Sequence, residues 1–465
     1  MKKIVILGFF LFGFYSVAIA QDYYMTAPVG FGAAATGGGT PTASNTVTVS
    51  TYTQLKNALT STTTANSVIL VSGVIDCSYT SVLLTNKTII GLPGARLRNT
   101  QITENLNPKL YPNRNDPSGI LNIKPGSKNI IVRNLIFEGP GAFDVDGRDN
   151  LTNEGINVWV DHCEFQDGED GNFDNKGEAD NVTISWCKFT YLKPSMPGGF
   201  GGSADHRFTN LVGSAIDDFN TTDSNGRYSI TFKNCYWADG CKERMPRARN
   251  AELHILNCYY KTSVSSAKAI ALGAGDKGTT CYVENCNFEQ VGTVSSPVTE
   301  GAGTTAVKFD GCTKGTTPTA VTGLDVGTAT KPTYSYTVLP VANVATYVSD
   351  SSCGAGATLL VSSTGVISTA CPNLGVEDHV ASANVKFYPV PVDTVLNIAL
   401  SEAVSGDDIT VDLFSIEGVK AFSYSKKNVA TNEKLSLNLA GLAKGIYLCN
   451  LKIGNVTSTQ KIIKN

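Results

Sequence analysis

The sequence predicts an all-β protein whose main part is a parallel β-helix, and three observations support this prediction. A β-rich unit recurs through the middle of the chain and ends in a polar residue, a cysteine and, two positions later, an aromatic residue. Successive copies follow one another at similar intervals, which fall in the range of repeat periods that indicates a solenoid. Only 17% of the residues are charged and long helical periodicity is scarce, as expected for many short strands and turns. A solenoid with strands in each unit is a parallel β-helix.

Residues 1–20 have the pattern of a signal peptide. Lys2 and Lys3 precede an apolar run over 4–17, and 18–20 form a small-residue cleavage site. The run is short for a membrane anchor, which is the alternative interpretation. We therefore expect export, a mature chain beginning near Gln21 and no membrane span in that mature chain.

The next segment is predicted to cover one end of the solenoid. Residues 52–59 place Leu55, Ala58 and Leu59 on one side of a short amphipathic helix. Uncovered strand edges invite aggregation, so this helix is the expected cap. Strands over 67–75 and 87–90 would then begin the coils of a catalytic domain that we place at residues 21–360.

The repeat predicts ladders of equivalent side chains inside the β-helix. Coils stack about 4.8 Å apart, and the aromatic shares a face with the cysteine two residues before it. The interval from Cys187 to Cys235 is about twice as long as the others, so it is either two coils or one coil with a long loop. The positions in the cysteine ladder are Leu135, Cys163, Cys187, Cys235, Cys258, Cys286 and a degenerate Cys312.

Twelve cysteines in an exported chain would ordinarily indicate disulfides. A ladder favours a different interpretation, because a free cysteine behaves as a small buried hydrophobe. Parallel Cβ vectors also hold stacked sulfurs poorly for bonding. We expect the ladder cysteines to be thiols and regard Cys353 and Cys371, after the repeats, as the better disulfide candidates.

The C-terminal part is predicted to be a separate small domain. Composition becomes linker-like over 361–384, and alternating strand patterns follow within 385–465. The expected strands are 395–398, 409–414, 434–439 and 446–453. Turn signals between them indicate a small β-sandwich.

Ionisable residues concentrate in two acidic segments, 144–149 and 167–176, and one basic segment, 242–249. The acidic segments lie one coil apart, so stacking brings them side by side. Carboxylates that close cannot all stay ionised without a cation, and oxygen ligands favour Ca²⁺. Solvated turns are the alternative for the acidic segments.

The basic segment contains three arginines, whose planar forks grip carboxylates at two points. A basic surface strand is the alternative. The formal net charge of −3 argues against nucleic acid as a partner, yet a local basic groove remains compatible with an acidic polymer.

These segments carry a resemblance to polysaccharide lyase family 1, the pectate lyases. Residues 157–162 (Asn-Val-Trp-Val-Asp-His) resemble the family's vWiDH signature, and Arg244-x-Pro246-x-x-Arg249 resembles its RxPxxR signature. Asp170-Gly171-x-x-Asp174-x-Lys176 is similar to its calcium segment. The glycine-rich opening over 30–39 and the segment 86–91 also fit, and the resemblance spans roughly positions 28 to 355.

The resemblance implies a right-handed β-helix and specific roles in β-elimination. Asp149, Asp170 and Asp174 match the primary calcium ligands, and Asp146 is an additional candidate. Arg244 matches the catalytic base, although arginine is normally protonated. The residues that match or are expected to contact the substrate are Lys176, Lys193 and Arg249. His162 invites a catalytic role, but we expect the Trp159–His162 motif to be structural.

The resemblance therefore implies a calcium-dependent pectate lyase that cleaves polygalacturonate into unsaturated oligogalacturonates, and we expect it to be a monomer. Two alternatives remain open at this point. A pectin lyase would act on methylated polymer without calcium, and the retained Asp170 and Asp174 argue against it. A non-catalytic polysaccharide-binding adhesin has the same fold but no need for Arg244.

The C-terminal domain resembles the Por-type sorting tail of the type IX secretion system. The matching features are Phe387-Tyr388-Pro389-x-Pro391-Val392, Gly418, Gly445-Ile446-Tyr447 and the closing Lys461 to Lys464. This resemblance implies export to the cell surface or medium by the type IX machinery, with removal of the tail. A carbohydrate-binding sandwich is the alternative.

Overall fold

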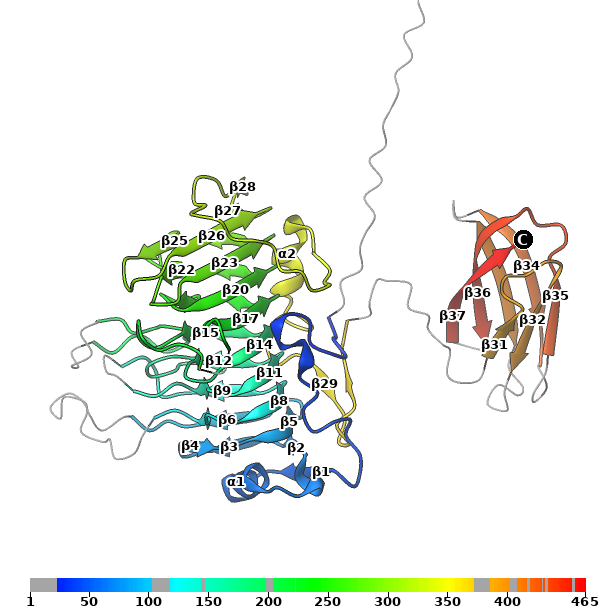
Figure 1. Ribbon diagram of the computed structural model, residues 1–465. Coiled ribbons are helices and arrows are strands. Elements are labelled where there is room, and N and C mark those ends of the chain that lie inside the picture. Colours follow the sequence, from blue (N-terminus) through cyan, green and yellow to red (C-terminus); the bar gives the residue numbers. More distant parts are fainter. Residues whose placement is uncertain are drawn as a thin grey trace, which may run out of the picture. The chain divides into compact units, whose positions relative to one another are not determined.

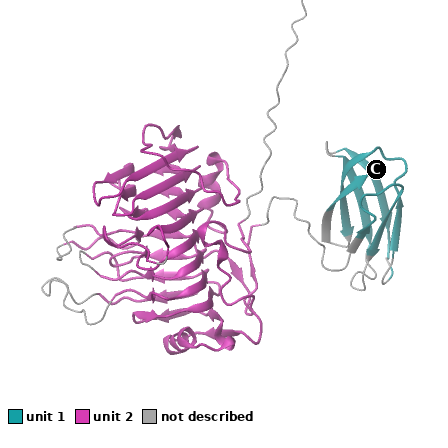
Figure 2. Cartoon of the chain, in the orientation of Figure 1, with its two compact units in different colours: residues 1–21, 373–465 teal, residues 22–372 magenta. Residues whose placement is uncertain are grey.

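The computed structural model describes residues 23–102, 118–143, 147–197, 204–221, 223–371, 385–400, 408–415, 419–428, 430, 434–453 and 456–465. The chain divides into two compact units, coloured separately in Figure 2. The larger unit is residues 22–372, and the other contains the C-terminal strands. The predicted signal peptide lies outside the described residues.

Three long sheets, called here A, B and C, run side by side through the larger unit, and successive coils contribute a strand to each (Figure 1). Neighbouring strands are parallel, apart from the last pair of sheet B. Sheet A consists of β1 (Thr46–Val49), β2 (Val68–Val71), β5 (Thr85–Gly91), β8 (Lys128–Arg133), β11 (Ile156–Asp161), β14 (Asp180–Ser185), β17 (Tyr228–Lys233), β20 (Ala251–Leu256), β23 (Thr279–Glu284) and β26 (Thr305–Asp310).

Sheet B consists of β3 (Val74–Asp76), β6 (Arg96–Arg98), β9 (Ile136–Glu138), β12 (Glu164–Gln166), β15 (Lys188–Thr190), β18 (Tyr236–Trp237), β21 (Tyr259–Lys261), β24 (Asn287–Gln290), β27 (Thr313–Lys314) and β28 (Thr319–Ala320). Sheet C consists of β4 (Thr80–Val82), β7 (Leu121–Ile123), β10 (Leu151–Asn153), β13 (Phe173–Asn175), β16 (Leu211–Val212), β19 (Arg247–Ala248), β22 (Lys268–Gly273) and β25 (Thr293–Val298). This is the parallel β-helix that the repeat predicts.

The long interval between Cys187 and Cys235 is one coil with long loops. Strand β14 pairs directly with β17, so the two cysteines lie on consecutive coils. The extra residues fall on either side of the short strand β16. Figure 1 shows loops leaving the stack on the side opposite α2.

The predicted ladders fill the interior. The ladder cysteines are buried and free, as expected for small apolar side chains. Beside them the aromatics stack ring on ring, with centroids 4.3 to 5.5 Å apart. The stack runs Phe137, Phe165, Phe189, Trp237, Tyr260 and Phe288.

The residue before each of the first six ladder positions forms the corner between sheets A and B. These corner residues have φ of +47° to +57°, the left-handed region in which asparagine is the most tolerated side chain after glycine. His162 is one of them, which gives this histidine a structural reason to be where it is. The corners are Asn134, His162, Trp186, Asn234, Asn257 and Asn285.

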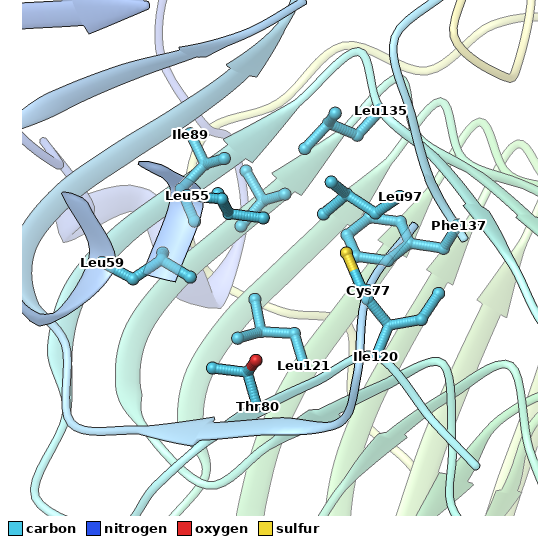
Figure 3. A pocket seen from close by; sticks show the side chains of 11 residues that line it. Leu55, Leu59, Cys77, Thr80, Ile89, Leu97, Ile120, Leu121, Leu135 and Phe137 are labelled. Atoms are coloured by element: carbon cyan, nitrogen blue, oxygen red, sulfur yellow. The ribbon is translucent and has the colours of Figure 1, made fainter. Parts of the chain in front are cut away.

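Helix α1 (Tyr52–Thr60) closes one end of the core as predicted. Its buried face is Leu55, Ala58 and Leu59. Figure 3 shows Leu55 and Leu59 pointing toward the same apolar space as Phe137. The cavity left there is only about 10 Å³, so the end of the β-helix is almost filled. Two short 3₁₀ helices, η1 (Phe31–Ala34) and η2 (Thr64–Asn66), flank this region in sequence.

The expected linker starts later than predicted. Helix α2 (Val341–Val348) and the hairpin of β29 (Leu360–Val361) and β30 (Ile367–Ser368) pack on the β-helix. Their buried apolar side chains outweigh the Ser/Thr/Gly-rich composition that indicated a linker. A Cys353–Cys371 disulfide joins this segment, as the sequence favoured. The remainder of the predicted linker, 372–384, lies outside the described residues.

The C-terminal unit contains two antiparallel sheets, of three and four strands, around an apolar core. The predicted strands are present, and β31, β34 and β37 are additional. The strands are β31 (Val385–Tyr388), β32 (Val395–Leu400), β33 (Ile409–Ser415), β34 (Lys420–Lys426), β35 (Lys434–Asn438), β36 (Gly445–Ile453) and β37 (Val456–Lys464).

Candidate active site

The predicted acidic and basic segments meet on the outer face of sheet C. Side chains alternate along a strand, so Phe173 points into the core while Asp174 points outward. Thr152 pairs with Asp174, and Leu211 pairs with Arg247. The backbone NH of Leu211 donates to Asp174 Oδ1 at 2.8 Å, which joins the two pairs into one outward row. The register of the coils therefore places β13 and β19 on the same face of sheet C with only β16 between them, although they are far apart in sequence.

Two carboxylates border the same glycine. A Cβ placed on Gly171 would lie 2.6 Å from Asp149 Oδ1 and 2.8 Å from Asp174 Oδ1. Both aspartates are 3% exposed. Thr152 Oγ1 donates to Asp149 Oδ2 at 2.7 Å, whereas Asp149 Oδ1 is buried and has no hydrogen-bond partner among the described residues. The arrangement is an oxygen-lined cradle that only glycine leaves open.

Burial and mutual repulsion make this pair electrostatically unfavourable. Burial raises the pKa of Asp149, and Lys176 partly offsets that effect. Burial and the Asp149 charge raise the pKa of Asp174 well above its usual value. Buried carboxylates so placed favour either protons or a cation.

The third predicted ligand points elsewhere. Asp170 Oδ1 is 2.7 Å from Nε2 of His206 and 3.9 Å from Nη1 of Arg244. In the described part of the chain, the three aspartates do not bring their oxygens within 4.8 Å of one another. Asp170 thus borders the cradle from the cationic side. Asp146, the fourth candidate, lies outside the described residues.

Oxygen donors, an orphaned buried oxygen and a space kept open by Gly171 fit a hard divalent cation such as calcium. Asp149 and Asp174 would hold it, and Asp170 lies on the side of the cradle that faces His206 and Arg244.

Arg244 stands at the edge of this cluster. Its guanidinium lies over the Phe208 ring, 4.7 Å from the centroid, and the side chain is 18% exposed. Its φ is +60°, a strained region for a residue with a β-carbon. The backbone NH of Asn210 donates to the Arg244 carbonyl at 2.7 Å and helps to hold this conformation. Such strain is typical of functional positions.

The neighbouring acid Glu243 pairs with Lys268 at 3.3 Å rather than with Arg244. A structural alternative for Arg244 is an ion pair with Glu243 or Asp239 that steadies the strand, whereas the described acid nearest its guanidinium is Asp170.

The predicted substrate-binding residues differ in their placement. Lys176 joins the cluster, with Nζ 3.7 Å from Asp149 Oδ2. Burial lowers the pKa of Lys176, but Asp149, Asp174 and Asp170 outweigh burial and raise it.

Lys193 lies apart from the aspartate pair and donates to the carbonyl of Gly139 at 2.8 Å. Arg249 is on the outer face of sheet C, but its fork is already bound to Glu300 at 2.5 Å.

The Trp159–His162 motif is internal, as expected. Arg133 donates from Nε and Nη2 to Asp161 Oδ2 at 2.9 and 2.7 Å. Burial raises the pKa of Asp161, but His162 and Arg133 outweigh burial and lower it to about 2. Trp159 and His162 are at most 1% exposed. These residues stabilise the coil beneath the N-terminal segment.

Sequence reasoning missed His206, Phe208 and Glu300. His206 and Phe208 lie in a long loop of the coil between Cys187 and Cys235, where no repeat fixes position. Glu300 follows β25 and carries no motif. Neither spacing nor composition marks any of the three.

A family model described as pectate lyase matches residues 17–358. The chain belongs to the pectate lyase family. Its match to a pectate trisaccharide-lyase of Thermotoga maritima is 30% identical over 184 residues, covering 38% of this chain and 40% of the relative. A pectate lyase of Bacillus subtilis is 28% identical over 200 residues, covering 35% and 43%. The chain thus spans about two fifths of the length of these relatives.

Solved pectate lyases share the fold. One from Paenibacillus sp. 0602 has a TM-score of 0.54 at 18% identity, covering 73% of this chain and 97% of that one. A pectate lyase bound to a hexasaccharide has a TM-score of 0.52 at 20% identity, covering 70% and 96%. The expectation of a pectate lyase-like β-helix is confirmed.

The C-terminal unit matches a secretion system C-terminal sorting domain over residues 386–465. This domain indicates secretion or export to the cell surface, as predicted. No helix among the described residues is long and apolar enough to cross a membrane.

Proposed function

We propose that the chain is a calcium-dependent pectate lyase that cleaves α-1,4-polygalacturonate by β-elimination and releases 4,5-unsaturated oligogalacturonates. The main observation in support of this proposal is that an acidic cradle and a row of cationic side chains lie next to each other on one face of sheet C. Asp149 and Asp174 supply the acidic side, and Lys176 and Arg244 supply the cationic side. An acidic polymer needs such cations, and a carboxylate pair alone would repel it.

Each side chain has a distinct task in this proposal. Asp149 and Asp174 would hold calcium, which would supply a Lewis acid to stabilise charge developing on the uronate. Lys176 attracts the substrate carboxylate. Arg244 accepts the C5 proton, and the C4 glycosidic oxygen then leaves with the bonding electrons. Arginine is normally protonated, so its chemistry alone does not suggest a base. The assignment of this role to Arg244 is based on the family resemblance and on the position of the side chain.

Hydrolysis is a poorer match for this site. It requires one carboxylic acid and one carboxylate on opposite sides of the scissile bond. Asp149 and Asp174 instead lie together beside Gly171.

The decisive test is the ultraviolet absorbance of the unsaturated product. Purified protein is expected to generate absorbance from polygalacturonate in calcium and to lose this activity in excess chelator, with recovery on adding calcium back. Highly methylated pectin is the comparison substrate and should react more slowly. Full activity in chelator together with a preference for methylated pectin would favour the pectin-lyase alternative, and binding without product would favour the adhesin.

A second expected result concerns processing during export. The predicted signal peptide ends near Ala20, and the sorting domain starts after the disulfide-bonded Cys371. Because 353–371 is packed on the β-helix, we expect the tail to be cut between 372 and 385 rather than nearer Gly354. Intact-mass analysis of the protein secreted by its native host checks both ends. A secreted species that retains Ile463 and Asn465 would contradict tail removal.

A further inference from the structure

A partly buried ion-pair cluster lies on the same face of sheet C; its arginines are two coils from β13 of the acidic cradle, and its carboxylate, Glu300, follows β25. Glu300 accepts hydrogen bonds from Arg249 Nε at 2.5 Å and from Arg247 Nη2 at 3.2 Å. Arg249 Nη2 adds a contact at 3.4 Å to the second carboxylate oxygen. One carboxylate therefore occupies the space between the two guanidinium forks of the basic segment.

Glycine allows this arrangement. Residue Gly273 pairs with Val298, and Glu300 follows two residues later. A Cβ on Gly273 would lie 2.2 Å from Glu300 Oε1 and 2.7 Å from its Cγ. The Glu300 side chain thus crosses the outer surface of the sheet directly over Gly273, where a larger residue would project.

Arg249 has a second set of contacts besides Glu300. Its Nη1 donates to the carbonyl of Gly213 at 2.9 Å and to that of Ser214 at 3.3 Å. Arg247 has a buried Nε with no hydrogen-bond partner in the described part of the chain, and its side chain is 29% exposed. One arginine is therefore held by backbone, and the other has unused donor capacity. A uronate carboxylate could therefore use the donors that now hold Glu300 only if Glu300 moved away.

The charges of this cluster interact with Arg244 of the candidate active site. Burial and then Arg249 lower the pKa of Arg247, and Arg244 adds to this effect. Burial raises the pKa of Glu300, but Arg249 and Arg247 outweigh burial and lower it, so Glu300 is ionised at neutral pH. A uronate approaching this part of the outer face of sheet C meets the Glu300 carboxylate instead of two free arginines.

We propose that Glu300 is a specificity-determining residue: its carboxylate takes the anion position shared by Arg247 and Arg249, and a substrate uronate binds there only by displacing it. This rests on the proposed function, because it assumes a polyuronate in the groove. It predicts that Glu300 weakens the binding of unesterified polymer and has little effect on esterified polymer, which lacks the competing charge.

The test compares Glu300→Gln with wild type in KM and kcat on polygalacturonate and on highly methylated pectin. We expect KM for polygalacturonate to fall about 2- to 5-fold, the range of a partly exposed ion pair, with kcat nearly unchanged. KM for methylated pectin should change far less. Asp325→Asn is the matched control, since it removes the same charge from a pair with Lys308 beside sheet A.

A second variant displaces the Glu300 side chain without changing its charge. Gly273→Ala leaves the charge intact but should push the Glu300 side chain off the sheet surface. It should lower KM in the same direction as Glu300→Gln. Melting temperatures of both variants establish that they are folded. If KM for polygalacturonate is unchanged or rises in folded variants, Glu300 only braces the arginines and the inference is wrong.

A binding measurement separates this inference from the proposed function. Retardation in gels containing polygalacturonate is compared for Arg244→Lys and Arg244→Lys/Glu300→Gln, which keeps turnover from interfering. Stronger retardation of the double variant supports the inference even if wild type proves to have no lyase activity. Equal retardation overturns it even if wild type is a lyase.

Discussion

Replacing Arg244 by lysine is expected to reduce kcat on polygalacturonate by about 10²- to 10⁴-fold, the usual contribution of a general base. The variant keeps a positive charge but loses the planar fork and changes the reach of the side chain, so the substitution is not conservative in function. The guanidinium lies over Phe208 and 3.9 Å from Asp170, between the aromatic loop and the acidic cradle. A lysine ammonium is a single point charge and lacks the planar guanidinium that lies over Phe208.

The loss should appear in kcat more than in KM, because a group that acts on the transferred proton contributes mainly in the transition state. Folding should be unaffected, since the hydrogen bond from Asn210 to residue 244 uses the backbone carbonyl. Arg98→Lys is a matched control: Arg98 pairs with Asp76 on sheet B, away from the outer face of sheet C. A folded Arg244→Lys variant with near-wild-type kcat would require a different base.

Most of the fold could be predicted because each coil of a solenoid places the same types of residue at the same positions. Each coil needs a residue tolerant of positive φ at the corner, a small side chain after it and an aromatic two residues further on. The sequence repeats this as Asn234-Cys235-x-Trp237 and Asn257-Cys258-x-Tyr260. One copy therefore predicts the next. His162 occupies the equivalent corner of its own coil, so the repeat itself indicated a structural role for this histidine.

The candidate site was predictable where it lies on strands and unpredictable where it lies on loops. Asp174 and Arg247 belong to strands of one sheet, so their segments could be expected to align once the coils were counted. His206 belongs to an insertion, and nothing in a repeat specifies where an insertion folds back. The pairing of Arg249 with Glu300 joins different coils through side chains alone, which leaves no spacing signal.

The composition of the chain also gave the wrong C-terminal boundary for the larger domain. The stretch after 354 is rich in Ser, Thr and Gly, which is typical of linkers. A few apolar residues decide otherwise: Leu359 and Val361 pack against Val68, Leu70 and Ile90 on the outer face of sheet A. Covering the apolar outer face of sheet A requires only a few apolar side chains, so the rest of the segment can remain polar.

Replacing Asp174 by asparagine is expected to raise the calcium concentration needed for half-maximal activity by at least about 100-fold. Charge count and oxygen donors set calcium affinity, and this substitution removes one of the two carboxylates that border Gly171. The asparagine carbonyl can still accept the hydrogen bond from the backbone NH of Leu211, so the pairing of β13 with β16 should survive.

Stability in chelator distinguishes a metal ligand from a structural aspartate. Burial and the charge of Asp149 raise the pKa of Asp174, so its ionised form opposes folding at neutral pH. Stability from this group is present at low pH and is lost as pH rises through the raised pKa. Asp174→Asn removes that repulsion, and its melting temperature in chelator should be no lower than that of wild type.

In calcium the order of melting temperatures should reverse, because wild type gains stability from a bound ion and the variant gains less. Asp180→Asn is the matched control: Asp180 is also buried, accepts a hydrogen bond from Ser229 at 2.9 Å and lies on sheet A, away from the cradle. It should leave the calcium requirement unchanged. If Asp174→Asn melts lower than wild type in chelator and keeps the wild-type calcium requirement, then Asp174 supports the strand and the metal must be held elsewhere.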